Sequence, residues 1–141
     1  MFLNKTFWLL IITLFFSFDS YSRGDLAIRS KKIELKLGSE SSDYEMSLKT
    51  INLETGKSYR LEISSMGFKE YEFEAEDFFK NIWIRKIEVE GIEIKVPTIN
   101  EIEFERDGEI EINFVPIRTG VFKFEIEGLQ NKGMVGKFVI E

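Results

Sequence analysis

The chain contains no cysteine and no histidine, and each absence excludes a class of chemistry. Without cysteine there is no disulfide, no thiolate nucleophile, no iron–sulfur cluster and no Cys-ligated zinc site. Without histidine there is no imidazole base and no imidazole metal ligand, which excludes a Ser-His-Asp triad and a copper centre built from two His and one Cys. Because so few catalytic groups remain, we expect a protein that is not an enzyme.

Proline is also scarce, and positive charge is outnumbered by negative charge. The 141 residues include two prolines, 19 Lys and Arg, and 25 Asp and Glu, which gives a net charge of -6. Nucleic acids and anionic membrane surfaces are bound through Lys and Arg patches, so this balance argues against both as partners. The length suits a single domain.

The N-terminal segment has the pattern of a signal peptide. Lys5 precedes residues 7–18, which are apolar apart from Thr13 and Ser17. This run of roughly a dozen residues is too short to span a bilayer, and the small Ser20 and Ser22 stand before a plausible cleavage site. We therefore predict a signal peptide at residues 1–22 and a periplasmic or secreted mature chain with no transmembrane segment. The alternative is an anchor that is not cleaved.

Residues 23–141 are predicted to form one all-β domain. Apolar and charged residues alternate in short runs, which is the side-chain period of a strand, and turn signals separate the runs. The spacing predicts an antiparallel Greek-key β-sandwich or barrel of about eight strands. Gly91 and the pair Asp107-Gly108 are read as hairpin turns. One short helical turn is expected at residues 76–81, because adjacent Phe78 and Phe79 cannot both face the core from a strand.

The C-terminal half of the domain resembles the cupredoxin family. Residues 114–124 (FVPIRTGVFKF) resemble the strand, Pro-x-x-x-Gly turn and following strand of that family, and residues 133–139 (GMVGKFV) resemble its Gly-Met-x-Gly ending. Upstream, residues 71–74 (YEFE) resemble a His-Glu-Phe-Glu run of small exported bacterial cupredoxin-like proteins. The resemblance covers roughly residues 30–141 and implies a β-sandwich in an exported setting.

The resemblance also shows which copper ligands this chain lacks. The first His position is held by Tyr71, or by Glu70 if the alignment moves by one residue, and the Cys position falls at Ile126. The second His has no counterpart, and only the axial Met remains, as Met134. A type 1 copper site depends on the thiolate and the imidazoles, with the axial Met a weak contact. The electron-transfer function of the family is therefore not expected here.

A different metal site is the first functional hypothesis. Carboxylates suit hard cations and thioethers suit Cu(I), so a pocket of Met, Tyr and carboxylate groups would hold copper or iron. The alternative is that the glutamates form a solvated strand face and the methionines fill the core. The candidate metal ligands are Met134, Glu70, Tyr71, Glu72 and Met66.

Two further groups are candidates for binding. The glutamates at 101, 103, 105, 109 and 111 are expected on one face of a hairpin, where they would bind a cation or a basic partner, or would block sheet pairing. Trp83 with Arg85 is typical either of a protein contact or of a core tryptophan with a stacked arginine.

These observations lead to one function and one alternative. We predict an exported, non-enzymatic cupredoxin-like accessory protein that handles copper or iron in the periplasm and binds a metal ion and a periplasmic or membrane protein. The alternative is a redox-inert protein–protein interaction module on the same scaffold, without a metal. Fold resemblance alone does not choose between them.

Overall fold

Alternation of apolar and charged side chains folds this chain into strands, because successive side chains of a strand point to opposite faces. The computed structural model describes residues 29–66 and 68–141, so the predicted signal peptide at residues 1–22 lies outside the described residues. The strands are β1 (Lys31–Leu37), β2 (Thr50–Leu53), β3 (Tyr59–Ser65), β4 (Tyr71–Glu74), β5 (Ile82–Val89), β6 (Ile92–Ile94), β7 (Glu101–Phe104), β8 (Gly108–Pro116), β9 (Gly120–Ile126) and β10 (Val135–Ile140).

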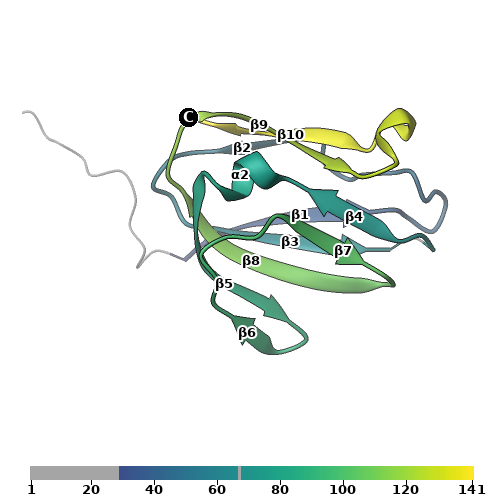
Figure 1. Cartoon of the computed structure of the whole chain (residues 1–141), viewed down its shortest axis with the longest axis horizontal. Helices are drawn as coiled ribbons and strands as arrows, with labels where there is room; N and C mark the ends of the chain where they lie inside the picture. Colours follow the sequence, from purple (N-terminus) through teal and green to yellow (C-terminus); the bar gives the residue numbers. More distant parts are fainter. Residues whose placement is uncertain (1–28, 67) are drawn as a thin grey trace, which may run out of the picture.

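The ten strands form two sheets packed face to face (Figure 1). Sheet A has five strands in the order β1-β3-β8-β5-β6, and sheet B has five in the order β2-β10-β9-β4-β7. The predicted all-β sandwich is confirmed, with ten strands where about eight were expected. It is not purely antiparallel, because β1 pairs with β3 and β10 with β2 in parallel. Both kinds of pairing give the same alternation along a strand, so the pattern alone could not tell them apart.

The predicted helical turn is present as α2 (Glu76–Phe79), and both of its phenylalanines are buried. The ring of Phe78 stacks on that of Phe138, with centroids 3.7 Å apart, and thereby joins α2 to strand β10. A short 3-10 helix, η1 (Gln130–Lys132), precedes β10. Within residues 29–66 and 68–141, no helix is long and apolar enough to cross a bilayer.

Of the two predicted hairpins, one is confirmed and one is wrong. Strands β5 and β6 pair across a two-residue turn at Glu90 and Gly91, whose φ angles are 48° and 80°. The pair Asp107-Gly108 does not join a hairpin, because β7 pairs with β4 in sheet B while β8 pairs with β3 and β5 in sheet A. The chain crosses from one sheet to the other at this turn, and this crossing gives β7 a different neighbour from the one expected.

Candidate functional site

Glutamate side chains cover much of the outer face of sheet B. On β4, Tyr71 and Phe73 are buried, so Glu72 and Glu74 between them point outward. Strand β7 pairs antiparallel with β4 and sets Glu103 opposite Glu72 and Glu101 opposite Glu74. The four carboxylates therefore lie on one face, at the distance of directly paired strand residues.

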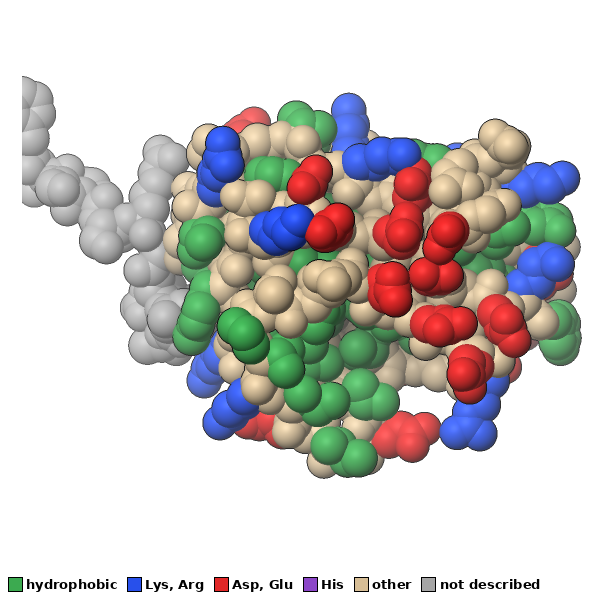
Figure 2. Space-filling model, viewed as in Figure 1, with side chains coloured by type: hydrophobic (Ala, Val, Ile, Leu, Met, Phe, Trp, Pro, Cys, Tyr) green, Lys and Arg blue, Asp and Glu red, His purple; other side chains and the backbone are tan. Residues whose placement is uncertain are grey.

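Two more glutamates extend this cluster, one on β9 and one directly after it. Glu125 lies opposite Glu74, and the backbone N–H of Glu127 donates to the carbonyl oxygen of Glu72 over 2.9 Å. We call the six residues the acidic face, and Figure 2 shows acidic side chains gathered on this side of the molecule. The acidic face consists of Glu72, Glu74, Glu101, Glu103, Glu125 and Glu127.

Three carboxylates of the acidic face come close enough to share a cation. One oxygen each of Glu72, Glu74 and Glu101 lie within 4.8 Å of one another. A Ca²⁺ ion bound by oxygens at 2.3–2.6 Å has opposite ligands about 5 Å apart, so oxygens at this spacing can reach one ion of that size, and a smaller ion would draw them closer together. Beside it is an open hollow of about 380 Å³ lined by Glu74, Glu101 and Glu125, among others. Glu72 and Glu74 are half-buried and Glu101 is exposed.

The acidic face carries more negative charge than its surroundings neutralise. The pKa of Glu72 is raised to about 7, first by a carboxyl–carboxylate hydrogen bond with Glu127, then by burial and the charges of neighbouring glutamates. Burial, followed by the charges of Glu127, Glu125 and Glu101, also raises the pKa of Glu74. Among the described residues, Lys123 is the only cation in an ion pair with any of the six, through Glu125. A bound cation would supply the missing positive charge.

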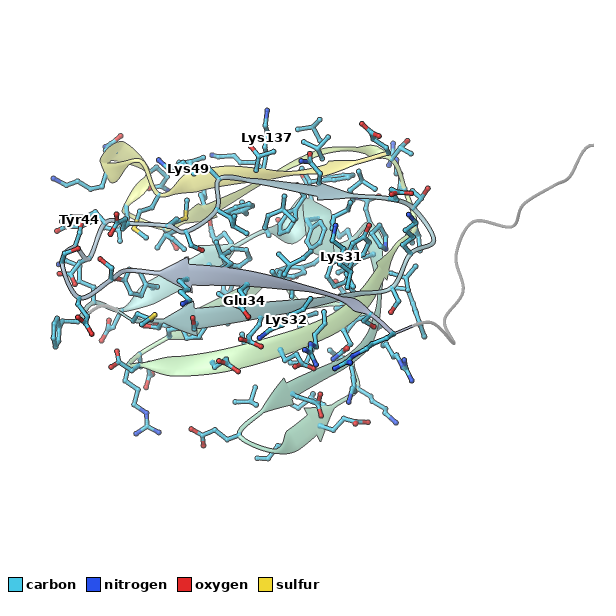
Figure 3. All side chains as sticks on the ribbon, turned by 180° about the vertical axis from the view of Figure 1, so that it is seen from behind. Lys31, Lys32, Glu34, Tyr44, Lys49 and Lys137 are labelled. Carbon is cyan, nitrogen blue, oxygen red and sulfur yellow. The ribbon has the colours of Figure 1, made fainter. Side chains whose placement is uncertain are left out.

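The outer face of sheet A shows the opposite arrangement. There Lys32 and Glu34 lie side by side (Figure 3), and the Lys32 nitrogen is 2.5 Å from a Glu34 oxygen and 3.0 Å from a Glu62 oxygen. The hydrogen bond from Lys32 lowers the pKa of Glu34. Glutamates also lie opposite one another on sheet A, but there Lys and Arg side chains pair with them, whereas on the acidic face a single lysine does. Ordinary solvation of a charged strand explains the outer face of sheet A. It does not explain why so many carboxylates with so few cations gather on the acidic face of sheet B.

Two of the predicted metal ligands, Tyr71 and Met134, lie in the core. Both side chains are fully buried. The Tyr71 hydroxyl donates to the backbone carbonyl of Asp43 over 2.8 Å, and burial raises the pKa of the phenol, so the hydroxyl stays protonated at neutral pH. The carbonyl oxygen of Met134 accepts from the N–H of Ile126 over 3.0 Å. These contacts place Met134 beside β9, at the end of the sandwich where η1 lies.

The other three predicted ligands lie outside the core. Met66 follows β3 with 43% of its surface exposed, and its N–H donates to the carbonyl of Leu37 over 2.8 Å. Glu70 is exposed just before β4. Glu72 lies on the acidic face, on the opposite side of β4 from Tyr71. The structure thus brings Glu72 together with other carboxylates and separates it from Tyr71 and Met134.

The positions that the resemblance assigns to copper ligands do not fit a type 1 copper ion. Ile126 holds the thiolate position, is fully buried and pairs with Phe73 on β4. Tyr71 holds an imidazole position, and its hydroxyl is already hydrogen-bonded to Asp43. This end of the core is packed with apolar side chains and offers neither a thiolate nor an imidazole to a copper ion.

The remaining candidates fall in different places. Glu101 and Glu103 lie on β7, whereas Glu109 and Glu111 lie on β8 in the other sheet, so the predicted glutamate ladder is divided. Trp83 is about half exposed on β5. Sequence reasoning missed that the glutamates of β7 join those of β4. The available signal was that both short runs, YEFE and EIEF, alternate Glu with apolar residues.

No family model matches the chain, and no curated protein matches it. Solved structures do resemble it. A multicopper oxidase from Campylobacter jejuni, described as a metallo-oxidase, aligns with a TM-score of 0.53 and 10% identity over 85% of this chain and 31% of its own. The "blue" copper protein auracyanin A from Chloroflexus aurantiacus aligns with a TM-score of 0.52 and 12% identity over 80% of this chain and 100% of its own. A reduced auracyanin from Roseiflexus castenholzii aligns with a TM-score of 0.52 and 14% identity over 81% of this chain and 99% of its own.

These similarities show a cupredoxin-like fold, which the sequence resemblance had indicated. The chain spans nearly the whole of the auracyanins but only about a third of the oxidase. The chain therefore has a cupredoxin-like fold, and its sequence contains no Cys or His.

The prediction that the chain is not an enzyme needs correction. It rested on the missing His and Cys, but the same sandwich forms part of a metallo-oxidase. The fold therefore occurs within enzymes, and the absence of two residue types does not justify the exclusion.

Proposed function

We propose that this cupredoxin-like domain is an exported protein that binds copper or iron through the acidic face and not at the blue copper position. The observation that carries the proposal is the approach of the Glu72, Glu74 and Glu101 oxygens to within 4.8 Å of one another. The raised pKa values of Glu72 and Glu74 support it, because they reflect crowded negative charge that a cation would relieve. The copper-protein scaffold of the structural neighbours supports a metal as the ligand.

The chemistry of the ligand atoms predicts which metals bind most tightly. An all-carboxylate site prefers hard or borderline cations, so Fe(II), Fe(III) and Cu(II) should bind more tightly than Cu(I). The thioether of Met134 is buried in the core and that of Met66 lies outside the acidic face, so a soft thioether ligand does not belong to this site. Export to the periplasm, with a role in copper or iron handling there, is proposed on the signal-peptide pattern of residues 1–22.

The test is metal titration of the tag-free chain from Arg23, followed by native mass spectrometry. A His tag must be removed because it would supply imidazoles that the chain lacks. Fe(II), Cu(II) and Cu(I) are compared, with Mg(II) as a cation of weak carboxylate affinity. One-to-one binding of Fe(II) or Cu(II) should weaken at least about tenfold in the triple variant Glu72→Gln, Glu74→Gln, Glu101→Gln.

A matched triple variant keeps this result interpretable. Glu34→Gln, Glu62→Gln and Glu111→Gln remove the same number of carboxylates from the outer face of sheet A. An equal loss in both triple variants would show diffuse attraction and would overturn the site. Loss of binding in Met134→Leu, with the acidic-face variant unaffected, would instead favour the Met-based ligand set. Absence of stoichiometric binding of any metal would overturn the proposed function.

A further inference from the structure

The β5–β6 hairpin leaves part of the inner face of sheet A uncovered. Ile94 pairs directly with Ile87 and Ile92 with Val89, so both β6 isoleucines lie on the same face as the buried Ile87. Yet Ile92 is 64% exposed and Ile94 41% exposed. Figure 1 shows the hairpin projecting from the rest of the sandwich, so sheet B does not cover these side chains.

The same hairpin presents an unpaired strand edge. Strand β6 is the last of sheet A, and within residues 29–66 and 68–141 no strand pairs with its outer side. A two-residue turn closes on a hydrogen-bonded pair, here Val89 and Ile92, and the ladder bonds recur at Ile87 and Ile94. The N–H and C=O groups of Glu93 therefore point away from β5, free to bond to another strand.

A groove with an acidic rim continues from this hairpin along β7. It has a volume of about 400 Å³, and its apolar lining includes Val89, Ile102 and Ile110. Its acidic lining includes Glu90, Glu103 and Glu105. Figure 2 shows apolar side chains along this side of the molecule, next to the acidic ones. Strand β7 is itself the last strand of sheet B, so two strand edges flank an apolar surface with negative charge around it.

We propose that this open side binds an extended segment of a partner protein in which apolar residues alternate with Lys or Arg. The segment would add to β6 as a further strand, with bonds to the Glu93 backbone. Its apolar side chains would cover Ile92 and Ile94 on the inner face, and its alternate basic side chains would lie on the outer face beside Glu93. Strand addition supplies the backbone bonds that the edge lacks, and charge complementarity selects the partner.

A second copy of this chain fits the edge less well. Antiparallel self-pairing of a three-residue strand about its centre sets Glu93 opposite its own copy, and directly opposed like charges destabilise a strand pair. The rims of the two copies would also repel, since both are acidic. The net charge of -6 acts in the same direction. The observations therefore favour a basic partner.

The experiment measures binding of a capped, fluorescein-labelled peptide of alternating Val and Lys, by fluorescence anisotropy on chelator-treated protein. Metal removal ensures that no bound metal ion contributes to peptide binding. Glu93→Pro removes the outward N–H, whereas Glu93→Gln removes the charge and keeps the N–H. Proline should weaken binding by about tenfold or more relative to glutamine. Ile92→Glu with Ile94→Glu should abolish binding, and the surface change Val121→Glu, at a residue about as exposed as Ile92, should not alter it.

Three results would overturn the proposal. The first is no saturable binding of the Val/Lys peptide to folded protein, with folding checked by circular dichroism. The second is equal binding of a Val/Glu peptide, or of a backbone N-methylated Val/Lys peptide that cannot form the strand bonds. The third is concentration-dependent dimerisation in sedimentation that Glu93→Pro abolishes, since the occupant would then be a second copy.

Discussion

At the scale of single residues, the acidic face is held together against its own repulsion. Glu72 and Glu74 are fixed on the outer face because their neighbours on β4 are in the core. The packing energy of the buried aromatic residues, Tyr71 and Phe73, therefore sets the positions of the carboxylates. The contribution of the acidic face to the stability of the fold should therefore change more with pH than that of the ion-paired outer face of sheet A.

Replacing Glu72 by glutamine should stabilise the metal-free domain at alkaline pH. The folded-state pKa of about 7 exceeds the ordinary value of 4.5, so the folded state binds more protons than the unfolded state between these values. Stability therefore falls as pH rises from about 4.5 through about 7. Glu72→Gln removes this fall, and thermal unfolding from pH 5 to pH 8 would measure it.

The control for this change is Glu62→Gln on sheet A. Glu62 contacts Lys32, so its loss should lower the melting temperature slightly or leave it unchanged. A higher melting temperature in both variants would trace the effect to total negative charge and would contradict the role assigned to the acidic face.

Gly136 lets the ring of Phe124 pack directly against the backbone, which a residue with a side chain would prevent. A Cβ at this position would overlap the ring of Phe124, which is fully buried. Gly136→Ala should therefore cost about 1–3 kcal/mol in chemical denaturation, the usual range for overpacking. Gly108→Ala is the matched control, because the nearest atom to its Cβ is 3.9 Å away. Equal effects in the two variants would point to the loss of glycine flexibility instead.

At the scale of elements, the single turn of α2 closes one part of the core. Phe78 stacks on Phe138 and meets Phe114 edge-to-face at 5.4 Å, so one residue connects α2 with both sheets. Phe78→Ala should cost about 3–5 kcal/mol, measured by urea unfolding. Phe68→Ala should change stability little, because Phe68 is 94% exposed. Comparable losses in the two would contradict this view of the core.

The sequence predicted the elements much better than their neighbours. Alternation located the strands, and the adjacent Phe78 and Phe79 located α2, because both signals are local. Pairing is decided by packing between distant segments, so the parallel partners of β1 and β2 and the separation of β7 from β8 left no trace in the pattern. The candidate site shares this limit, since Glu72 was singled out but its approach to Glu101 depends on the pairing of β4 with β7.

At the scale of the whole molecule, the C-terminal strand is essential. Strand β10 lies between β2 and β9 in sheet B, and the Glu141 carbonyl accepts from the Thr55 N–H over 2.8 Å. A chain that ends at residue 134 would lose β10 and leave two strand edges unpaired. Compared with the chain from Arg23 to Glu141, we expect it to lack a cooperative thermal transition in circular dichroism. A cooperative transition near that of the longer chain would contradict this expectation.

The pairing of β2 with β10 also has a consequence for when the protein can fold. Thr55 and Glu141 are 86 positions apart, and contacts between such distant residues slow folding because the loop between them must close first. Sheet B therefore cannot be completed until the residues of β10 have left the ribosome. This delay suits the predicted export, because a polypeptide that is threaded through a narrow channel has to remain unfolded until it is released.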